Sequence, residues 1–106
     1  MQKIALSFTY YTDIIEMTDE IAKHIKKYQN AFDKWLYDKN NEHGLWVYIN
    51  GKKKAVSFDS SDFVNYLNTY IIRDNNMKVR IVQSGLEKTP SDIPVLFFWE
   101  LFFCFM

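Results

Sequence analysis

The last twelve residues, VLFFWELFFCFM from Val95 to Met106, constrain the fold more than any other segment. They carry one polar side chain, Glu100, and five of the nine phenylalanines of the chain. An apolar run of this kind must be covered by the rest of the molecule or by a partner. As a helix it would span about 18 Å, which is too short for about 30 Å of bilayer hydrocarbon. The segment is therefore not expected to cross a membrane.

The density of Phe, Trp and Val in this segment favours a strand over a helix. Fully extended, the run would reach about 40 Å, roughly twice the length of a usual strand. We therefore expect a doubly buried, central strand over about Val95 to Leu101. Pro94 begins this strand, because a missing N–H group is tolerated at a strand start. Glu100 is expected to reach solvent at a sheet edge, or else to pair with Lys78 or Arg80.

Three alternatives remain for Phe102 to Met106, the end of the apolar run. These residues fold back and complete the core, or they form an exposed apolar patch that serves as an interface. The third alternative is that the chain end is not the natural one. The sequence does not decide between them.

The composition indicates one soluble domain with a substantial core. The chain has 106 residues, of which 48% are hydrophobic and 18% aromatic, enough to bury about two-thirds of the unfolded surface. Its 13 basic and 13 acidic residues cancel, which argues against nucleic acid and anionic lipid as partners. The single cysteine, Cys104, excludes an internal disulfide and suits a reducing cytoplasm. The apolar stretch Ile4 to Leu6 is too short for a signal peptide.

The first third of the chain predicts a strand followed by a long helix. Apolar side chains alternate with small or polar ones from residue 4 to residue 11, with one face formed by Ile4, Leu6, Phe8 and Tyr10. Asp13 and Glu16 then fit a helix-capping box. Apolar residues recur at spacings of three and four from there onward, at Ile14, Met17, Ile21, Ile25, Tyr28, Phe32 and Trp35. We expect one helix from about Asp13 to Tyr37.

The remaining elements follow from turn and capping signals. Asn50-Gly51 is typical of a type I′ turn, and it lies between apolar runs at 45–49 and 53–58, so a β-hairpin is expected. Ser60, Ser61 and Asp62 cap a second helix that ends near Arg73. Residues 77–82 alternate as another strand, and residues 85–93 form a loop before the final strand.

This order, β-α-β-β-α-β-β, predicts a single α+β domain. We expect an antiparallel or mixed sheet with both helices on one face, packed against Ile4, Leu6, Phe8, Val79 and Ile81. The order resembles the split βαβ arrangement of ferredoxin-like domains with one extra strand. Trp46 and Tyr48 would then lie on the open face.

No motif points to catalysis, a metal or a cofactor. His24 lacks a second ligand at helical spacing, and Glu20 four residues earlier predicts a surface contact instead. Glu42-His43 could be a catalytic fragment, but no nucleophile accompanies it, so a solvated loop is the expectation. The three glycines stand alone at turns and form no phosphate-binding loop. We expect neither an enzyme nor a cofactor.

The charged clusters each have a structural and a functional interpretation. Asp13, Glu16, Asp19 and Glu20 would complement the dipole of the long helix, or form an acidic patch that mimics phosphates. For the segment 59–62, a helix cap is favoured over a polar binding loop. Basic residues at 23, 26, 27 and 52–54, beside Trp46 and Tyr48, resemble the aromatic-plus-basic surface of single-strand binders. A lysine-rich turn is also an ordinary way to keep a sheet edge soluble.

These observations favour a small, cytoplasmic, non-catalytic protein-binding domain, such as an inhibitor of the toxin-immunity or phage-inhibitor type. The alternatives are an obligate homo-oligomer that pairs through its C-terminal strand, and a nucleic-acid-binding module. The residues expected to contact a protein partner, such as a toxin or another effector, are Glu16, Asp19, Glu20, Trp46, Tyr48, Lys52, Lys53, Lys54, Phe102, Phe103 and Phe105.

Overall fold

The computed structural model describes residues 1–98, and the predictions for Glu100, Phe102, Phe103 and Phe105 lie outside the described residues. The elements, in chain order, are β1 (Gln2–Ser7), β2 (Thr12–Met17), α1 (Asp19–Lys23), α2 (Ile25–Tyr37), β3 (Trp46–Ile49), β4 (Lys52–Val56), α3 (Ser60–Tyr66), the π-helical turn η1 (Leu67–Ile71), the 3-10 turn η2 (Asn75–Met77), β5 (Arg80–Leu86) and β6 (Val95–Phe97). Within residues 1–98, no helix combines the length and the apolar character that a bilayer crossing requires.

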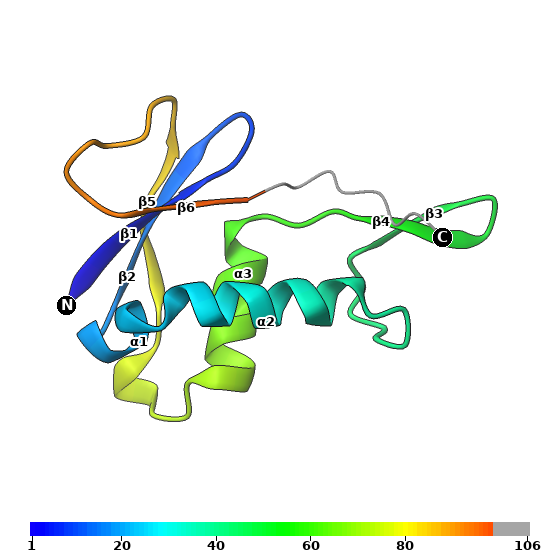
Figure 1. The fold of residues 1–106 in the computed structure, drawn as a ribbon, viewed down its shortest axis with the longest axis horizontal. Helices are drawn as coiled ribbons and strands as arrows, with labels where there is room; N and C mark the ends of the chain where they lie inside the picture. The colour runs from blue at the N-terminus through cyan, green and yellow to red at the C-terminus, as the bar shows by residue number, and fades with distance from the viewer. Residues whose placement is uncertain (99–106) are drawn as a thin grey trace.

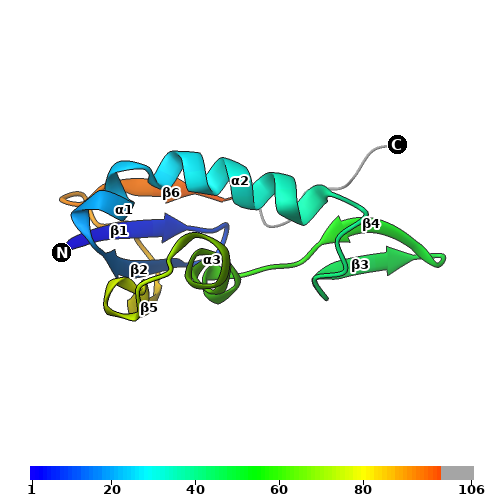
Figure 2. The ribbon, with the colours of Figure 1, turned by 90° about the horizontal axis from the view of Figure 1, so that it is seen from below.

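Four strands form a mixed sheet in the order β5-β2-β1-β6. β2 is antiparallel to both of its neighbours, and β1 is parallel to β6. The helices lie on one side of this sheet, and the separate β3–β4 hairpin projects at the end of the molecule away from the N-terminus (Figures 1 and 2). The predicted α+β class, with a mixed sheet and helices on one face, is confirmed.

The element order differs from the prediction because residues 12–17 form a strand and not the start of a helix. β2 lies between β1 and β5, and Ile14 and Ile15 are both buried although they point to opposite faces. A strand buried on both faces need not alternate, and Ile14, Met17 and Ile21 recur at spacings of three and four as they would on a helix. The helix begins only after Thr18, whose hydroxyl accepts a hydrogen bond from Ile21 N–H. His24 then separates α1 from α2.

Three further strand boundaries, the end of β1 and both ends of β5, differ from those predicted from the sequence. β1 ends at Ser7, because residues 8–11 form the turn into β2, where Phe8 N–H donates to the Tyr11 carbonyl at 2.9 Å. β5 begins at Arg80 and runs through Gly85, later than the predicted strand at 77–82. Gly85 has a φ of 72°, a conformation that only glycine adopts readily.

The apolar C-terminal run begins as an edge strand in the described part of the chain. Pro94 precedes it as expected, and its carbonyl accepts from Ala5 N–H at 2.9 Å. Leu96 and Phe98 are buried, but Phe97 is 64% exposed, so β6 is covered on one face only. The expectation of a central, doubly buried strand is therefore wrong for Val95–Phe97, because β6 pairs with β1 at the sheet edge.

The hairpin and the second helix agree with the turn and cap signals. Asn50 and Gly51 have φ angles of 53° and 75°, as a type I′ turn requires. Asp59 and Asp62 form a reciprocal capping box at the start of α3. The helical segment ends with η1 at Ile71, close to the predicted end near Arg73.

Aromatic rings fill the space between the sheet and the helices. The Phe32 ring on α2 lies 5.2 Å from Phe63 on α3 and 5.4 Å from Phe58, which follows β4. Phe98, which follows β6, lies 5.1 Å from both Phe8 and Phe63. Both helices, the sheet and the segment that leads to the hairpin therefore meet in one aromatic core.

Asp13 is a buried carboxylate that joins three elements, and not a helix cap. It lies on β2 with 6% exposure. One oxygen accepts from the Ser60 hydroxyl at the start of α3, and the other accepts from Gly85 N–H of β5 at 2.9 Å. This carboxylate fixes the position of α3 over the sheet.

Replacing Asp13 with Ala is expected to lower the free energy of unfolding by about 3 kcal/mol, because the buried Ser60 hydroxyl and the Gly85 N–H lose a charged acceptor. Asp13→Asn keeps one acceptor and is expected to cost about 1 kcal/mol. Urea denaturation measures both, with the exposed Asp92→Ala as the control, expected within about 0.5 kcal/mol of wild type. Equal stability of the Asp13→Ala and Asp92→Ala variants would refute this role.

Candidate functional site

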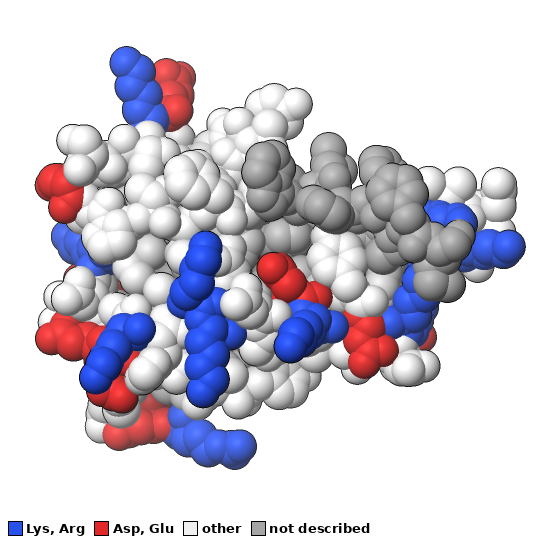
Figure 3. All heavy atoms as spheres, in the orientation of Figure 1, with Lys and Arg blue, Asp and Glu red and all other residues white. Residues whose placement is uncertain are grey.

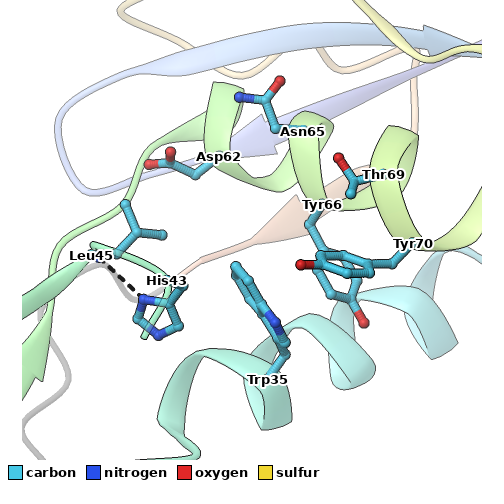
Figure 4. A pocket seen from close by; sticks show the side chains of 8 residues that line it. All are labelled: Trp35, His43, Leu45, Asp62, Asn65, Tyr66, Thr69 and Tyr70. Atoms are coloured by element: carbon cyan, nitrogen blue, oxygen red, sulfur yellow. Dashed lines mark hydrogen bonds between the residues drawn. The ribbon is translucent and has the colours of Figure 1, made fainter. Parts of the chain in front are cut away.

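A groove of about 290 Å³ lies between α2, the continuous segment α3–η1, and the loop before β3. The groove is lined by side chains from three segments, among them Trp35 from α2, His43 from the loop, and Asp62, Asn65, Tyr66 and Tyr70 from α3 and η1. Figure 4 shows the Trp35 ring rising between His43 on one side and the two tyrosines on the other. Asp62 and Asn65 extend from the helix above it. The groove thus combines an aromatic floor with a polar upper wall.

The aromatic rings of the groove form a continuous row that reaches the hairpin. Trp35 lies 5.2 Å from Tyr66 and 5.7 Å from Tyr70 on one side. On its other side it lies 4.8 Å from His43. His43 in turn stacks on Trp46, the first residue of β3, at 5.1 Å and an interplanar angle of 17°. Ring contacts at these distances are favourable, so they pack the groove against the base of the hairpin.

His43 is held by the backbone through both of its ring nitrogens. Leu45 N–H donates to Nδ1 at 3.1 Å, so Nδ1 must be the unprotonated nitrogen. Nε2 then carries the hydrogen and donates to the Leu36 carbonyl at 2.8 Å. Residues 42–43 lie in a loop as expected, with Glu42 exposed and the half-buried His43 ring packed between two tryptophans. This arrangement gives His43 a structural role at the edge of the groove.

Asp62 gives the upper wall its charge, and Asp59 lies beside it in the cap of α3. Burial raises the pKa of Asp62, although one of its oxygens accepts from Asp59 N–H at 2.9 Å. The Ser61 hydroxyl, which donates to Asp59, lowers the pKa of that carboxyl group. Neither carboxylate belongs to an ion pair among residues 1–98. Burial also raises the pKa of Tyr66.

A second candidate surface is the β3–β4 hairpin, which exposes three consecutive apolar side chains. Val47, Tyr48 and Ile49 are 39%, 53% and 45% exposed. Lys52 follows at the turn and Lys54 is half-buried on β4. Figure 3 shows basic side chains gathered at this end of the molecule. The hairpin therefore presents an apolar strand beside a basic turn.

Two of the predicted partner-binding residues on the hairpin have structural roles. Trp46 is buried, and its indole N–H donates to the Asn41 carbonyl at 2.7 Å, so the expectation that it lies in the open is wrong. Lys53 pairs with Glu42, donates to the Lys39 carbonyl at 2.6 Å, and lies over the Trp46 ring at 5.4 Å. Both residues hold the loop against the hairpin. Tyr48, Lys52 and Lys54 remain available on its surface.

Because residues 12–17 form a strand, the predicted acidic residues do not lie together on one helix. Glu16 lies on β2, where it accepts a hydrogen bond from Arg80 at 2.8 Å. Asp19 lies 3.7 Å from the N-terminal ammonium, and Glu20 lies 3.7 Å from His24, as expected of an i,i+4 pair. These residues sit at the α1 end, opposite the hairpin (Figure 1). The predicted acidic and basic residues thus do not form one site.

Sequence reasoning did not identify the groove. The sequence placed Trp35 in the apolar stripe of the long helix and Asp62 in the cap of the second helix. The available signal was Tyr66 and Tyr70 at a spacing of four, which places two aromatic rings on one helical face. Their meeting with Trp35 depends on how the helices pack, and the sequence does not specify that.

Comparisons of the chain with protein-family models, with curated proteins and with solved structures gave no match. Among residues 1–98, no three His, Cys, Asp or Glu side chains form a group that could hold a metal ion. Function is therefore argued from the groove and the hairpin themselves.

The Glu16–Arg80 pair predicts a specific pH dependence of stability. The hydrogen bond from Arg80 lowers the pKa of Glu16 below its ordinary value of 4.5. As the pH falls, the unfolded chain binds this proton before the folded chain does, so the stabilising contribution is present above pH 4.5 and is lost below it. Wild type should therefore lose more stability than Glu16→Gln between about pH 6 and about pH 3.

Urea denaturation across this pH range checks the prediction, with Glu87→Gln as the control, because Glu87 forms no ion pair with another described residue. The account predicts that the stability difference between wild type and Glu16→Gln shrinks as the solution is acidified. A difference that stays constant with pH would show that the Arg80 contact does not stabilise the fold.

Proposed function

We propose that this chain is a small, non-catalytic, cytoplasmic domain that acts by binding and covering a partner protein, as inhibitors of the toxin-immunity or phage-inhibitor type do. The observation that carries this proposal is the exposed run Val47-Tyr48-Ile49 on the projecting hairpin. Consecutive residues of a strand point to opposite faces, so both faces of the hairpin present apolar surface to solvent. Exposed apolar surface of this kind favours protein contact.

The hairpin also offers unpaired backbone groups. β3 and β4 pair only with each other among the described strands. Their outer edges can therefore accept an extended segment of a partner by main-chain hydrogen bonding. A tyrosine at the centre of such a surface supports binding, because Tyr is enriched among the residues that dominate interface energies.

Charge at the hairpin turn indicates which partner surface would fit. Lys52 and Lys54 belong to no ion pair among residues 1–98, whereas Lys53 is already held by Glu42. A basic rim around an apolar centre is complementary to an acidic surface, and it accelerates association with one. The proposed partner is thus a protein with an acidic border around an apolar patch.

A binding role fits the groove better than catalysis does. Both ring nitrogens of His43 are engaged with backbone groups, and a general base needs a free nitrogen within reach of its substrate. The carboxylates of Asp59 and Asp62 cap α3. His43, the imidazole of the described groove, is therefore not placed to act as a general base.

The proposal predicts that Tyr48→Ser weakens capture of the native partner by at least about tenfold, the loss expected for a central aromatic contact. Tagged protein would be isolated from its source cells and the complex measured by native mass spectrometry. Tyr10→Ser is the matched control, because Tyr10 is 85% exposed on the turn between β1 and β2, away from the hairpin. It should leave capture unchanged.

Two results would contradict the proposal. One is a protein recovered without any stoichiometric partner, and the other is a partner whose capture responds equally to Tyr48→Ser and Tyr10→Ser. Circular dichroism of both variants provides the folding control, since each substitution removes an exposed side chain and should leave the spectrum unchanged.

A further inference from the structure

We propose that the groove of Trp35, Tyr66, Tyr70 and Asp62 binds an arginine side chain of the partner protein. This inference rests on the proposed function, because it names the chemistry by which the same partner would be recognised beside the hairpin. The guanidinium group would lie against the aromatic faces and donate to the carboxylate above them.

The aromatic floor suits a planar cation. Trp35, Tyr66 and Tyr70 pack against one another at ring distances of 5.2 to 5.7 Å and together line the groove. Tyr70 is 54% exposed, so its ring is accessible from solvent. A cation within about 6 Å of such faces is attracted by the ring electrons, and arginine adds stacking of its flat guanidinium. The floor therefore offers more to arginine than to the compact ammonium of lysine.

The carboxylate of Asp62 supplies the complementary charge. One oxygen is occupied by Asp59 N–H, and no Lys or Arg of residues 1–98 pairs with this carboxylate. The Asp62 side chain is half-buried, and this burial raises its pKa. A guanidinium entering the groove would replace the missing solvation with a charge-assisted hydrogen bond.

The same charges disfavour the obvious alternative occupants. A nucleotide would also stack on the aromatic rings, but its phosphates would meet the Asp62 carboxylate without a cation from residues 1–98 to offset it. An uncharged apolar group would leave the Asp62 carboxylate desolvated without compensation. A cationic group can interact favourably with both the aromatic floor and the Asp62 carboxylate.

The groove lies where a protein bound to the hairpin can reach it. His43 contacts Trp35 in the groove and stacks on Trp46 at the start of β3. The aromatic row thus runs from the groove to Trp46, the first residue of the strand that exposes Tyr48. One partner surface can therefore contact the hairpin and insert an arginine beside it.

The test needs no partner protein. N-acetyl-L-arginine methylamide is titrated into the full chain, and the indole N–H of Trp35 is followed by ¹H–¹⁵N NMR. The capped citrulline amide has the same shape without the charge, and the capped lysine amide has the charge without the plane. We expect saturable shifts of Trp35 and its groove neighbours with arginine, and at least about fivefold weaker binding of the other two probes.

Matched variants locate the site. Asp62→Asn keeps an amide oxygen for Asp59 N–H and removes the charge, and Tyr70→Ala removes an exposed ring. Each should weaken arginine binding by about fivefold. Asp74→Asn is the control, because Asp74 likewise accepts a backbone N–H, from Asn76, at a different turn. It should leave the affinity unchanged.

Equal binding of arginine and citrulline amides, or no effect of Asp62→Asn, would overturn the assignment. Lysine binding as tight as arginine would overturn the choice of guanidinium. If the groove fails these tests while capture of a partner still depends on Tyr48, the proposed function stands without the groove. If arginine binds but no Tyr48-dependent partner exists, the protein-covering function fails instead.

Discussion

The packing of aromatic rings around Phe32 is the interaction on which the rest of the structure depends. Phe32 is fully buried on α2, and its ring contacts Phe58, Phe63 and Tyr66 at 5.2 to 5.4 Å. Phe58 follows the hairpin, whereas Phe63 and Tyr66 lie on α3. The ring therefore sets the positions of the hairpin and of the groove wall together. Loss of a buried phenylalanine typically costs about 3 to 5 kcal/mol, so both surfaces depend on this one contact.

The sequence predicted the elements that local chemistry determines. The Asn50-Gly51 turn and the Asp59–Asp62 cap depend on residues that are close in the chain, and both are present as expected. Ile14 and Ile15 were misassigned, because a strand buried on both faces carries no alternation that would distinguish it from a helix. The edge position of β6 depends on which strands pair, and the groove depends on how α2 meets α3. Both are tertiary contacts that local patterns do not contain.

The molecule separates its structural charges from its accessible ones. The Asp13 carboxylate accepts hydrogen bonds from Ser60 and Gly85, and the Glu16 carboxylate accepts one from Arg80. These contacts hold α3 and β5 in place. At the hairpin end, by contrast, an apolar strand and a basic turn adjoin an aromatic groove whose carboxylate forms no ion pair within residues 1–98. A surface with an apolar centre, a polar rim and a pocket is typical of protein recognition. The proposed function is based on this difference between the paired charges inside the fold and the accessible groups at the hairpin end.

Hydrogen–deuterium exchange of the captured complex tests most directly whether this end of the molecule faces the partner. The account predicts slower backbone exchange at residues 45–54 and 62–70 in the complex than in the free chain. Exchange at residues 19–23 of α1, at the opposite end of the molecule (Figure 1), should be unchanged. Protection confined to the α1 end, with residues 45–54 exchanging as fast as in the free protein, would contradict the account.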